Sequence, residues 1–189
     1  MALEPDGNRI VTMDEHSMAE HSQDEQSPET YEPPEPSGWS DPLTGTDGPR
    51  LWDRILGSEL ARVRRYHRPA TVALVEVTGM DDVSRVWGAE IAEQAFIRVA
   101  RKLAIEIRSS DHIARVDRTR FAILLTETDE IAAINFVERV RQAIDQQPGE
   151  AGVAIGWASP ATATDLREAM ASAEARLVAE LALVEDGAI

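Results

Sequence analysis

The chain of 189 residues contains no cysteine. Disulfide bonds and thiolate-ligated metal sites are therefore excluded, and a reducing compartment fits this composition. No apolar run approaches the length of a membrane-spanning helix, which needs about 18 residues. The sequence does not begin with a basic stretch followed by an apolar one. We therefore expect neither a membrane span nor a secretory signal, and we expect a cytoplasmic protein.

Basic side chains are scarce relative to acidic ones. The sequence holds 19 Lys and Arg against 34 Asp and Glu, for a formal net charge of -15. A chain this acidic repels a nucleic-acid backbone, so we expect no DNA or RNA partner. Hydrophobic residues make up 43% of the chain, which is enough for the core of one domain beside a tail.

The acidic charge is concentrated at the N-terminus. Residues 1–40 hold ten acidic side chains and one basic one, and a proline-rich stretch, YEPPEPSG, occupies residues 31–38. Such a segment buries too little apolar surface to offset the entropy of ordering it. We predict a disordered acidic tail or linker over residues 1–38 and one folded domain over residues 39–185. The tail either keeps the protein in solution or docks on a basic patch, of its own domain or of a partner.

Hydrophobic periodicity predicts the elements of the domain. Apolar residues at three- and four-residue steps indicate helices, and short runs rich in β-branched residues indicate strands. A continuous run such as TVALVEV predicts a strand covered on both faces. The expected helices are 49–66, 90–107, 128–146 with Thr128 or Asp129 as cap, and one that Thr164 or Asp165 caps; the expected strands are 71–77, 113–116, 121–126 and 152–158.

Leaving out the first and last helices, the order is β-α-β-β-α-β. This is the split arrangement of ferredoxin-like α+β folds, with an antiparallel sheet and two helices on one face. The fold hosts many activities, so function has to be argued from particular residues. The strongest candidate is the charged turn of the expected hairpin, which carries Asp117, Arg118, Thr119 and Arg120.

Several segments in this order resemble the GGDEF domain of diguanylate cyclases, a domain of the nucleotide-cyclase palm type. Residues 41–45, DPLTG, look like that family's opening motif. Arg115 and residues 121–125, FAILL, look like the segments around its signature, and residues 154–158, AIGWA, look like its last core strand. The resemblance covers about residues 39–181 and implies a domain that handles guanine nucleotides.

The signature itself departs from the family pattern. The family's two glycines, which let the backbone approach a triphosphate, fall at Asp117 and Arg118, and its metal-binding acid falls at Thr119. A second metal position keeps an acid, the vestigial Glu76. The positions that read guanine in the family fall at Ser84 and Glu93. Because Mg²⁺ ions need carboxylates and two arginines would repel them, we expect no catalysis and no bound metal or other cofactor.

A further family feature is retained. Arg108 and Asp111 match the RxxD pattern of the product-binding inhibitory site. Arginine can donate two hydrogen bonds to guanine N7 and O6, and a carboxylate can accept from N1–H and the amino group. The resemblance therefore implies binding of cyclic di-GMP. The alternative is that Arg108 complements a helix dipole and Asp111 shapes a turn.

Three hypotheses follow from these residues. The first is a catalytically inactive regulatory domain that binds cyclic di-GMP, with the ligand bridging domains. The second is a nucleotide-independent module that engages a protein partner through the tip at residues 117–120 or through the last helix. The third is a residual diguanylate cyclase. A homodimer is compatible with each of them.

Overall fold

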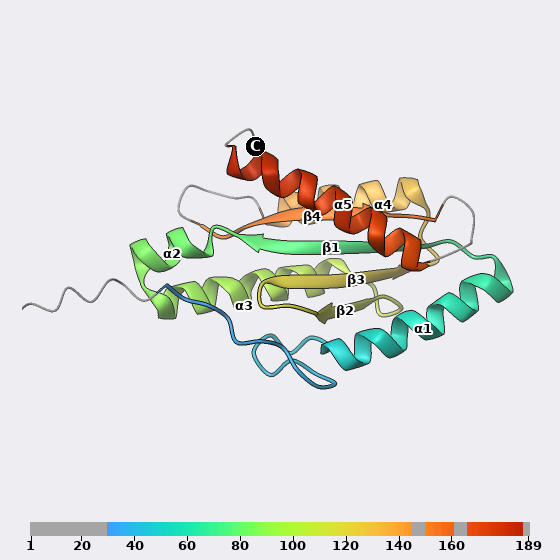
Figure 1. The fold of residues 1–189 in the computed structure, drawn as a ribbon, viewed down its shortest axis with the longest axis horizontal. Helices are drawn as coiled ribbons and strands as arrows, with labels where there is room; N and C mark the ends of the chain where they lie inside the picture. The colour runs from blue at the N-terminus through green and yellow to red at the C-terminus, as the bar shows by residue number, and fades with distance from the viewer. Residues whose placement is uncertain (1–29, 145–149, 161–165, 187–189) are drawn as a thin grey trace, which may run out of the picture.

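The computed structural model describes residues 30–144, 150–160 and 166–186, and Figure 1 shows their arrangement. In chain order the elements are α1 (Pro49–Tyr66), β1 (Ala70–Thr78), α2 (Met80–Trp87), α3 (Ala89–Glu106), β2 (His112–Arg115), β3 (Arg120–Thr126), α4 (Glu130–Ala143), β4 (Gly152–Ala158) and α5 (Leu166–Glu185). The expected α+β order is confirmed, with α2 added.

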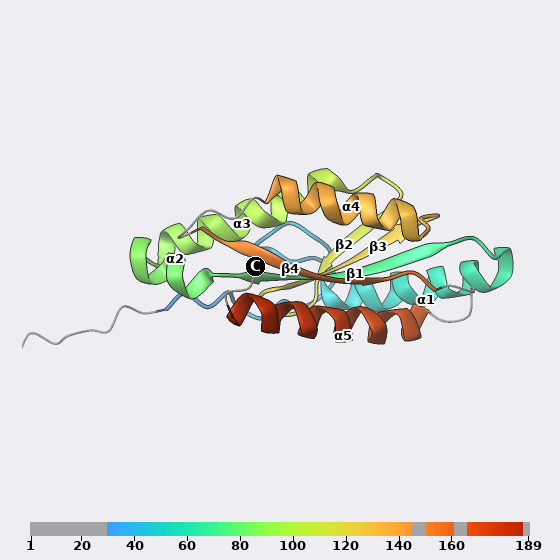
Figure 2. The same ribbon diagram turned by 90° about the horizontal axis from the view of Figure 1, so that it is seen from above.

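The four strands form one antiparallel sheet in the order β2-β3-β1-β4. Helices α3 and α4 cover one face, as expected of the two core helices, and α1 and α5 cover the other (Figure 2). None of the helices in the described part of the chain has the length and apolar character needed to cross a membrane.

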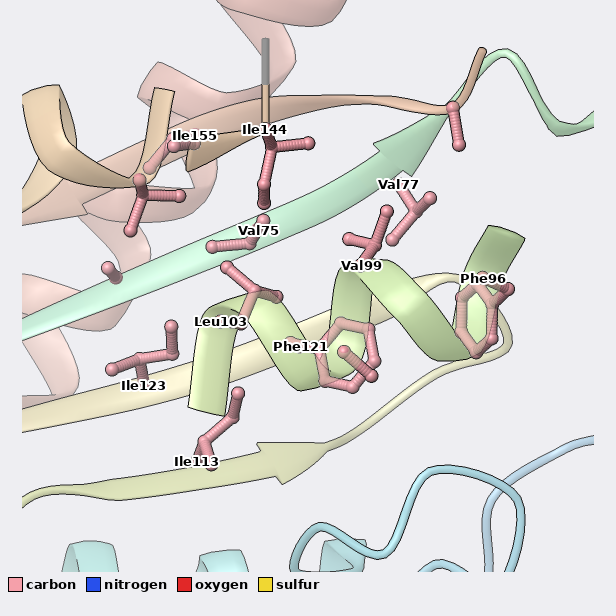
Figure 3. Close-up of a cluster of buried hydrophobic side chains, with 14 of the residues drawn as sticks. Val75, Val77, Phe96, Val99, Leu103, Ile113, Phe121, Ile123, Ile144 and Ile155 are labelled. Atoms are coloured by element: carbon pink, nitrogen blue, oxygen red, sulfur yellow. The ribbon is translucent and has the colours of Figure 1, made fainter. Parts of the chain in front are cut away.

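Strand β1 is one of the two inner strands of the sheet and is buried on both faces. Because side chains alternate along a strand, Val75 and Val77 join the cluster beneath α3 and α4, whereas Val72 and Leu74 join the cluster beneath α1 and α5. Figure 3 shows the first cluster, in which Phe121 lies among the side chains of α3. The continuous apolar run of β1 is thus explained by two hydrophobic layers, as predicted.

Helix α2 was not predicted. Asp81 and Asp82 lie in the first turn of this helix, which stands between two glycines. Gly79 and Gly88 have φ angles of 75° and 88°, which favour glycine at both ends of this helix. With only eight residues, the helix gives too short a periodic pattern to recognise.

The caps predicted for two helices have different outcomes. Asp129 caps α4, because its side chain accepts a hydrogen bond of 2.9 Å from the amide of Ala132. The caps expected at Thr164 and Asp165 lie outside the described residues, as does the expected end of the third helix at residue 146.

The predicted tail also lies mostly outside the described residues. Its last nine residues, 30–38, are described and contact the domain without forming a helix or strand. The sequence did not indicate which residues make these contacts, because isolated side chains and carbonyl groups leave no periodic pattern. Residues 31–36 are called the acidic strap below.

Candidate functional site

The loop between β2 and β3 is the candidate site. The two strands pair from His112 to Arg115 and from Phe121 to Leu124, and residues 116–120 close the hairpin. The backbone amide of Val116 donates 2.9 Å to the carbonyl of Arg120, which closes the loop. A rigid pair of strands therefore holds the four predicted residues, 117–120, in one place.

Arg120 points back toward the sheet. It faces Glu76 in the β1–β3 register, and its Nε donates 2.6 Å to Glu76 Oε2. The other oxygen of Glu76 accepts from the hydroxyl of Thr119. Both oxygens of Glu76 are thus engaged, one by Thr119 and the other by Arg120.

Helix α5 provides a second carboxylate that binds Arg120. Arg120 Nη1 donates 3.0 Å and 3.2 Å to the two oxygens of Glu174. Burial lowers the pKa of Arg120, but the hydrogen bond and charge of Glu76 and the charge of Glu174 outweigh it, and the net effect is a raised pKa. The guanidinium therefore stays charged and links β1, β3 and α5.

Arg115 lies completely buried behind the loop. Its Nη1 donates 3.0 Å to Asp41 of the DPLTG segment, and its Nε and Nη2 donate 3.1 Å and 2.8 Å to the carbonyl of Arg118. Its guanidinium also lies 5.1 Å from the ring centroid of Phe96. Arg115 was recognised in the sequence as part of a family segment, but this buried network gave no sequence signal.

Arg118 points outward and meets the acidic strap. Its Nε donates 2.7 Å to Glu35, and its Nη1 donates 3.1 Å to Glu32. Arg115 Nη2 donates to the carbonyl of Pro34 in the same strap. Docking of the acidic tail on its own domain, one of the two alternatives considered, is therefore observed for Glu32, Pro34 and Glu35.

The strap begins beside Ser84 and Glu93, the two positions where the resemblance implied guanine readers. The amide of Tyr31 donates 2.8 Å to the hydroxyl of Ser84 in α2. Burial, followed by the charge of Glu93 in α3, raises the pKa of Tyr31 to about 12. One short segment thus extends from Ser84 and Glu93 to Arg118 in the loop at residues 116–120, which is called the signature loop below.

Arg108 and Asp111 lie together before β2. Asp111 is buried, and its two oxygens accept 3.1 Å from the amide of Thr126 and 3.0 Å from the amide of Arg108. The Arg108 side chain is exposed. The turn role considered for Asp111 is therefore observed, while the ligand role of the pair stays a prediction.

No group of three or more His, Cys, Asp or Glu side chains within the described ranges is arranged to hold a metal ion. Glu76 has Arg120 as its ion-pair partner instead. The residues present at this position therefore do not fit a pair of divalent cations, because the carboxylate is already neutralised by a cation.

Comparison with known proteins gives a consistent result. The sequence model of the family described as diguanylate cyclase, GGDEF domain, matches residues 39–179. The probable diguanylate cyclase DgcC of Escherichia coli is 29% identical over 105 residues, which are 56% of this chain and 28% of DgcC. Diguanylate cyclase DosC of Escherichia coli is 26% identical over 106 residues, 56% of this chain and 23% of DosC. The matched region thus spans about a quarter of these curated relatives.

Solved structures resemble the fold at lower identity. The GGDEF domain of DgcB from Caulobacter crescentus, in complex with c-di-GMP, superposes with a TM-score of 0.69 at 18% identity, covering 76% of this chain and 90% of that one. Diguanylate cyclase SiaD from Pseudomonas aeruginosa, in complex with its activator SiaC, gives 0.66 at 23% identity, covering 75% and 57%. These likenesses establish the fold.

Proposed function

The chain belongs to the GGDEF-domain family of diguanylate cyclases, and from that membership we propose that it is a regulatory domain of cyclic di-GMP signalling that does not itself cyclise GTP. The observation that carries the proposal is the pairing of Glu76 with Thr119 and Arg120. Cyclisation of GTP depends on metal-borne positive charge beside the triphosphate. Here the acid that would hold the metal holds an arginine.

The magnitude of the repulsion supports this proposal. A unit charge pair about 5 Å apart interacts by roughly 3 kcal/mol at an effective dielectric of 20. A divalent ion beside Arg120 would meet about twice that repulsion before screening. An unfavourable energy of about 1.4 kcal/mol weakens binding tenfold. The repulsion by the guanidinium alone therefore lowers metal affinity by orders of magnitude.

The proposed ligand is cyclic di-GMP, bound through Arg108. The exposed guanidinium is available for the two acceptors on the guanine edge. Asp111 already accepts from two backbone amides and from the hydroxyls of Ser110 and Thr126, so it positions the turn, and its Oδ2 keeps a lone pair for the base. A ligand held this way can bridge two domains, and the proposed location is the cytoplasm, where this nucleotide is made.

Calorimetric titration with cyclic di-GMP tests the receptor. We expect micromolar binding that Arg108→Ala abolishes and that the matched variant Arg101→Ala, on the exposed face of α3, leaves unchanged. Sedimentation of the complex would report whether the ligand joins two copies. Absence of heat at high ligand concentration would contradict the proposal that the chain is a receptor for cyclic di-GMP.

A protein-interaction module is the second candidate, favoured by the acidic strap. Arg118 binds two carboxylates of an extended segment, which is how an arginine would hold an acidic partner. This function predicts no response to cyclic di-GMP, so the same titration separates the two candidates.

A residual cyclase is the third candidate, favoured by the relatives named diguanylate cyclases. The direct measurement is GTP turnover with Mg²⁺ or Mn²⁺, using the whole chain. We expect no product above background. Sustained formation of cyclic di-GMP would overturn the non-cyclising assignment, whatever the calorimetry finds.

A further inference from the structure

The acidic strap, residues 31–36, presents an aromatic ring at one end and two carboxylates further along. The backbone of Tyr31 is held by Ser84, and the carboxylates of Glu32 and Glu35 are held by Arg118. Tyr31 also packs against the hydrophobic cluster beneath α3 and α4. This order of groups, one ring followed by negative charges, is also the order of groups in a nucleotide.

The middle of the strap is fixed more firmly than its acidic side chains. Pro33 is buried, and the carbonyl of Pro34 accepts from the fully buried Arg115. Prolines restrict the unbound segment to extended conformations, so docking costs less entropy than it would for a flexible chain. The strap is therefore preorganised in an extended conformation before it docks.

The ion pairs of the strap are weak by comparison. The side chain of Arg118 is 45% exposed, and those of Glu32 and Glu35 are 73% and 60% exposed. Ion pairs this exposed contribute little to stability and are screened by salt. A ligand with more charge than two carboxylates can therefore displace them.

We propose that the acidic strap is a tethered competitor, which occupies the surface from Ser84 to Arg118 and must be displaced before a phosphate-bearing aromatic ligand can bind there. A tethered competitor lowers the apparent affinity of an outside ligand by the fraction of time that it occupies the site. The strap thus regulates access to the signature loop. This inference does not depend on ligand binding at Arg108, which lies before β2.

The test is calorimetry on the full chain, with GTP and inorganic tripolyphosphate as probes and no added metal. The variant Glu32→Gln with Glu35→Gln keeps the shape of two exposed side chains and removes their charge. We expect it to bind GTP about tenfold more tightly than the unchanged chain. Its control is Glu20→Gln with Glu25→Gln, which removes the same charge from the predicted tail and should change nothing.

Adding Tyr31→Ala separates the two ends of the site. The added substitution should strengthen binding of GTP further, because the guanine base can occupy the space left by the Tyr31 ring. It should leave the affinity for tripolyphosphate unchanged. Equal GTP affinity in the unchanged chain and in the glutamine variant would overturn the proposal. Absence of binding of both probes in all variants would overturn it as well.

A label next to the strap, at the residue before Tyr31, gives a direct readout of displacement. The chain has no cysteine, so Thr30→Cys, at an exposed position, provides a unique site for a spin label. Saturating GTP should increase the mobility of the label in the unchanged background. Binding of GTP without a change in mobility would show that ligand and strap do not compete.

Discussion

Arg115 donates a hydrogen bond of 3.0 Å to Asp41, 74 residues earlier in the chain, and the two side chains expose 0% and 2% of their surface. The same guanidinium donates to the carbonyls of Arg118 and Pro34. One buried cation therefore connects the DPLTG segment, the signature loop and the acidic strap. The position of the candidate site depends on this residue more than on any exposed one.

Removal of Asp41 should destabilise the domain strongly. Asp41→Ala leaves the buried Arg115 without its anionic partner, and it also removes the acceptor of a 2.9 Å hydrogen bond from the amide of Thr44. Breaking a buried pair from one side costs about 3–5 kcal/mol in the free energy of unfolding. Urea unfolding followed by circular dichroism measures this loss.

The matched control for Asp41 is an exposed pair of the same kind. Asp82 pairs with Arg85, and the two side chains are 64% and 67% exposed. Asp82→Ala should therefore change the free energy of unfolding by less than about 1 kcal/mol. Equal effects of the two substitutions would mean that the buried network does not hold the DPLTG segment.

Gly156 is predicted to tolerate no side chain. A Cβ at this position of β4 would lie 2.0 Å from the carbonyl oxygen of Ala173 and 2.4 Å from the amide of Leu177, both in the backbone of α5. Gly156→Ala should therefore lower the free energy of unfolding by more than about 2 kcal/mol, because a helix would have to move. Thermal unfolding is a sufficient measurement.

The contrasting position is Gly57 in α1. A Cβ there meets no atom within 4 Å, and alanine favours a helix over glycine by about 0.5–1 kcal/mol. Gly57→Ala should raise the midpoint of unfolding. Unchanged stability of Gly156→Ala would indicate that α5 does not pack on β4 at this distance.

The core of the fold was predictable because its signals are periodic. The apolar run of β1 and the three- and four-residue spacing in α3 each identify an element without knowledge of its neighbours. The split β-α-β-β-α-β order then leaves few arrangements of the sheet. Helix α2 was missed because its eight residues lie between two glycines.

The candidate site was predictable only in part. The sequence identified Thr119 and Arg120 as altered positions and Glu76 as a retained acid, and the β1–β3 register brings them together. It did not indicate that Arg118 would bind Glu32 and Glu35, more than 80 residues away. Contacts of single side chains over such separations depend on tertiary structure and leave no pattern in a sequence.

Acids restored to the signature loop should create a metal site. The double substitution Thr119→Glu with Arg120→Glu replaces both donors to Glu76 by carboxylates. Without metal, the clustered acids repel one another and the midpoint of thermal unfolding should fall. Mn²⁺ should then raise it, because binding to the folded state alone stabilises by about 2.7 kcal/mol at about 100 times the dissociation constant.

The control for this gain keeps the shape and omits the charge. Thr119→Gln with Arg120→Gln should unfold at the same temperature with and without Mn²⁺, as should the unchanged chain. A variant with both glutamates that ignores Mn²⁺ would show that the loop does not bring its side chains within reach of Glu76.

Docking of the acidic strap should weaken in alkaline solution because of Tyr31. Its pKa is raised from 10.0 to about 12 in the folded protein, mainly through burial and then through the charge of Glu93. The neutral phenol is therefore the form that docks. The contribution of Tyr31 is fully present below pH 10 and is lost as the pH rises toward about 12, because the released strap binds fewer protons than the docked one.

Absorbance titration of tyrosinate measures this shift. The chain has two tyrosines, so Tyr66→Phe leaves Tyr31 as the only one that titrates. We expect its midpoint well above that of a free tyrosine, and we expect Glu93→Gln to lower it by only part of the shift, since burial is the larger cause. Glu32→Gln with Glu35→Gln, which loosens the strap, should move the midpoint back toward 10.0. A midpoint near that value in the Tyr66→Phe protein itself would contradict docking of the ring, because an exposed phenol carries no such penalty.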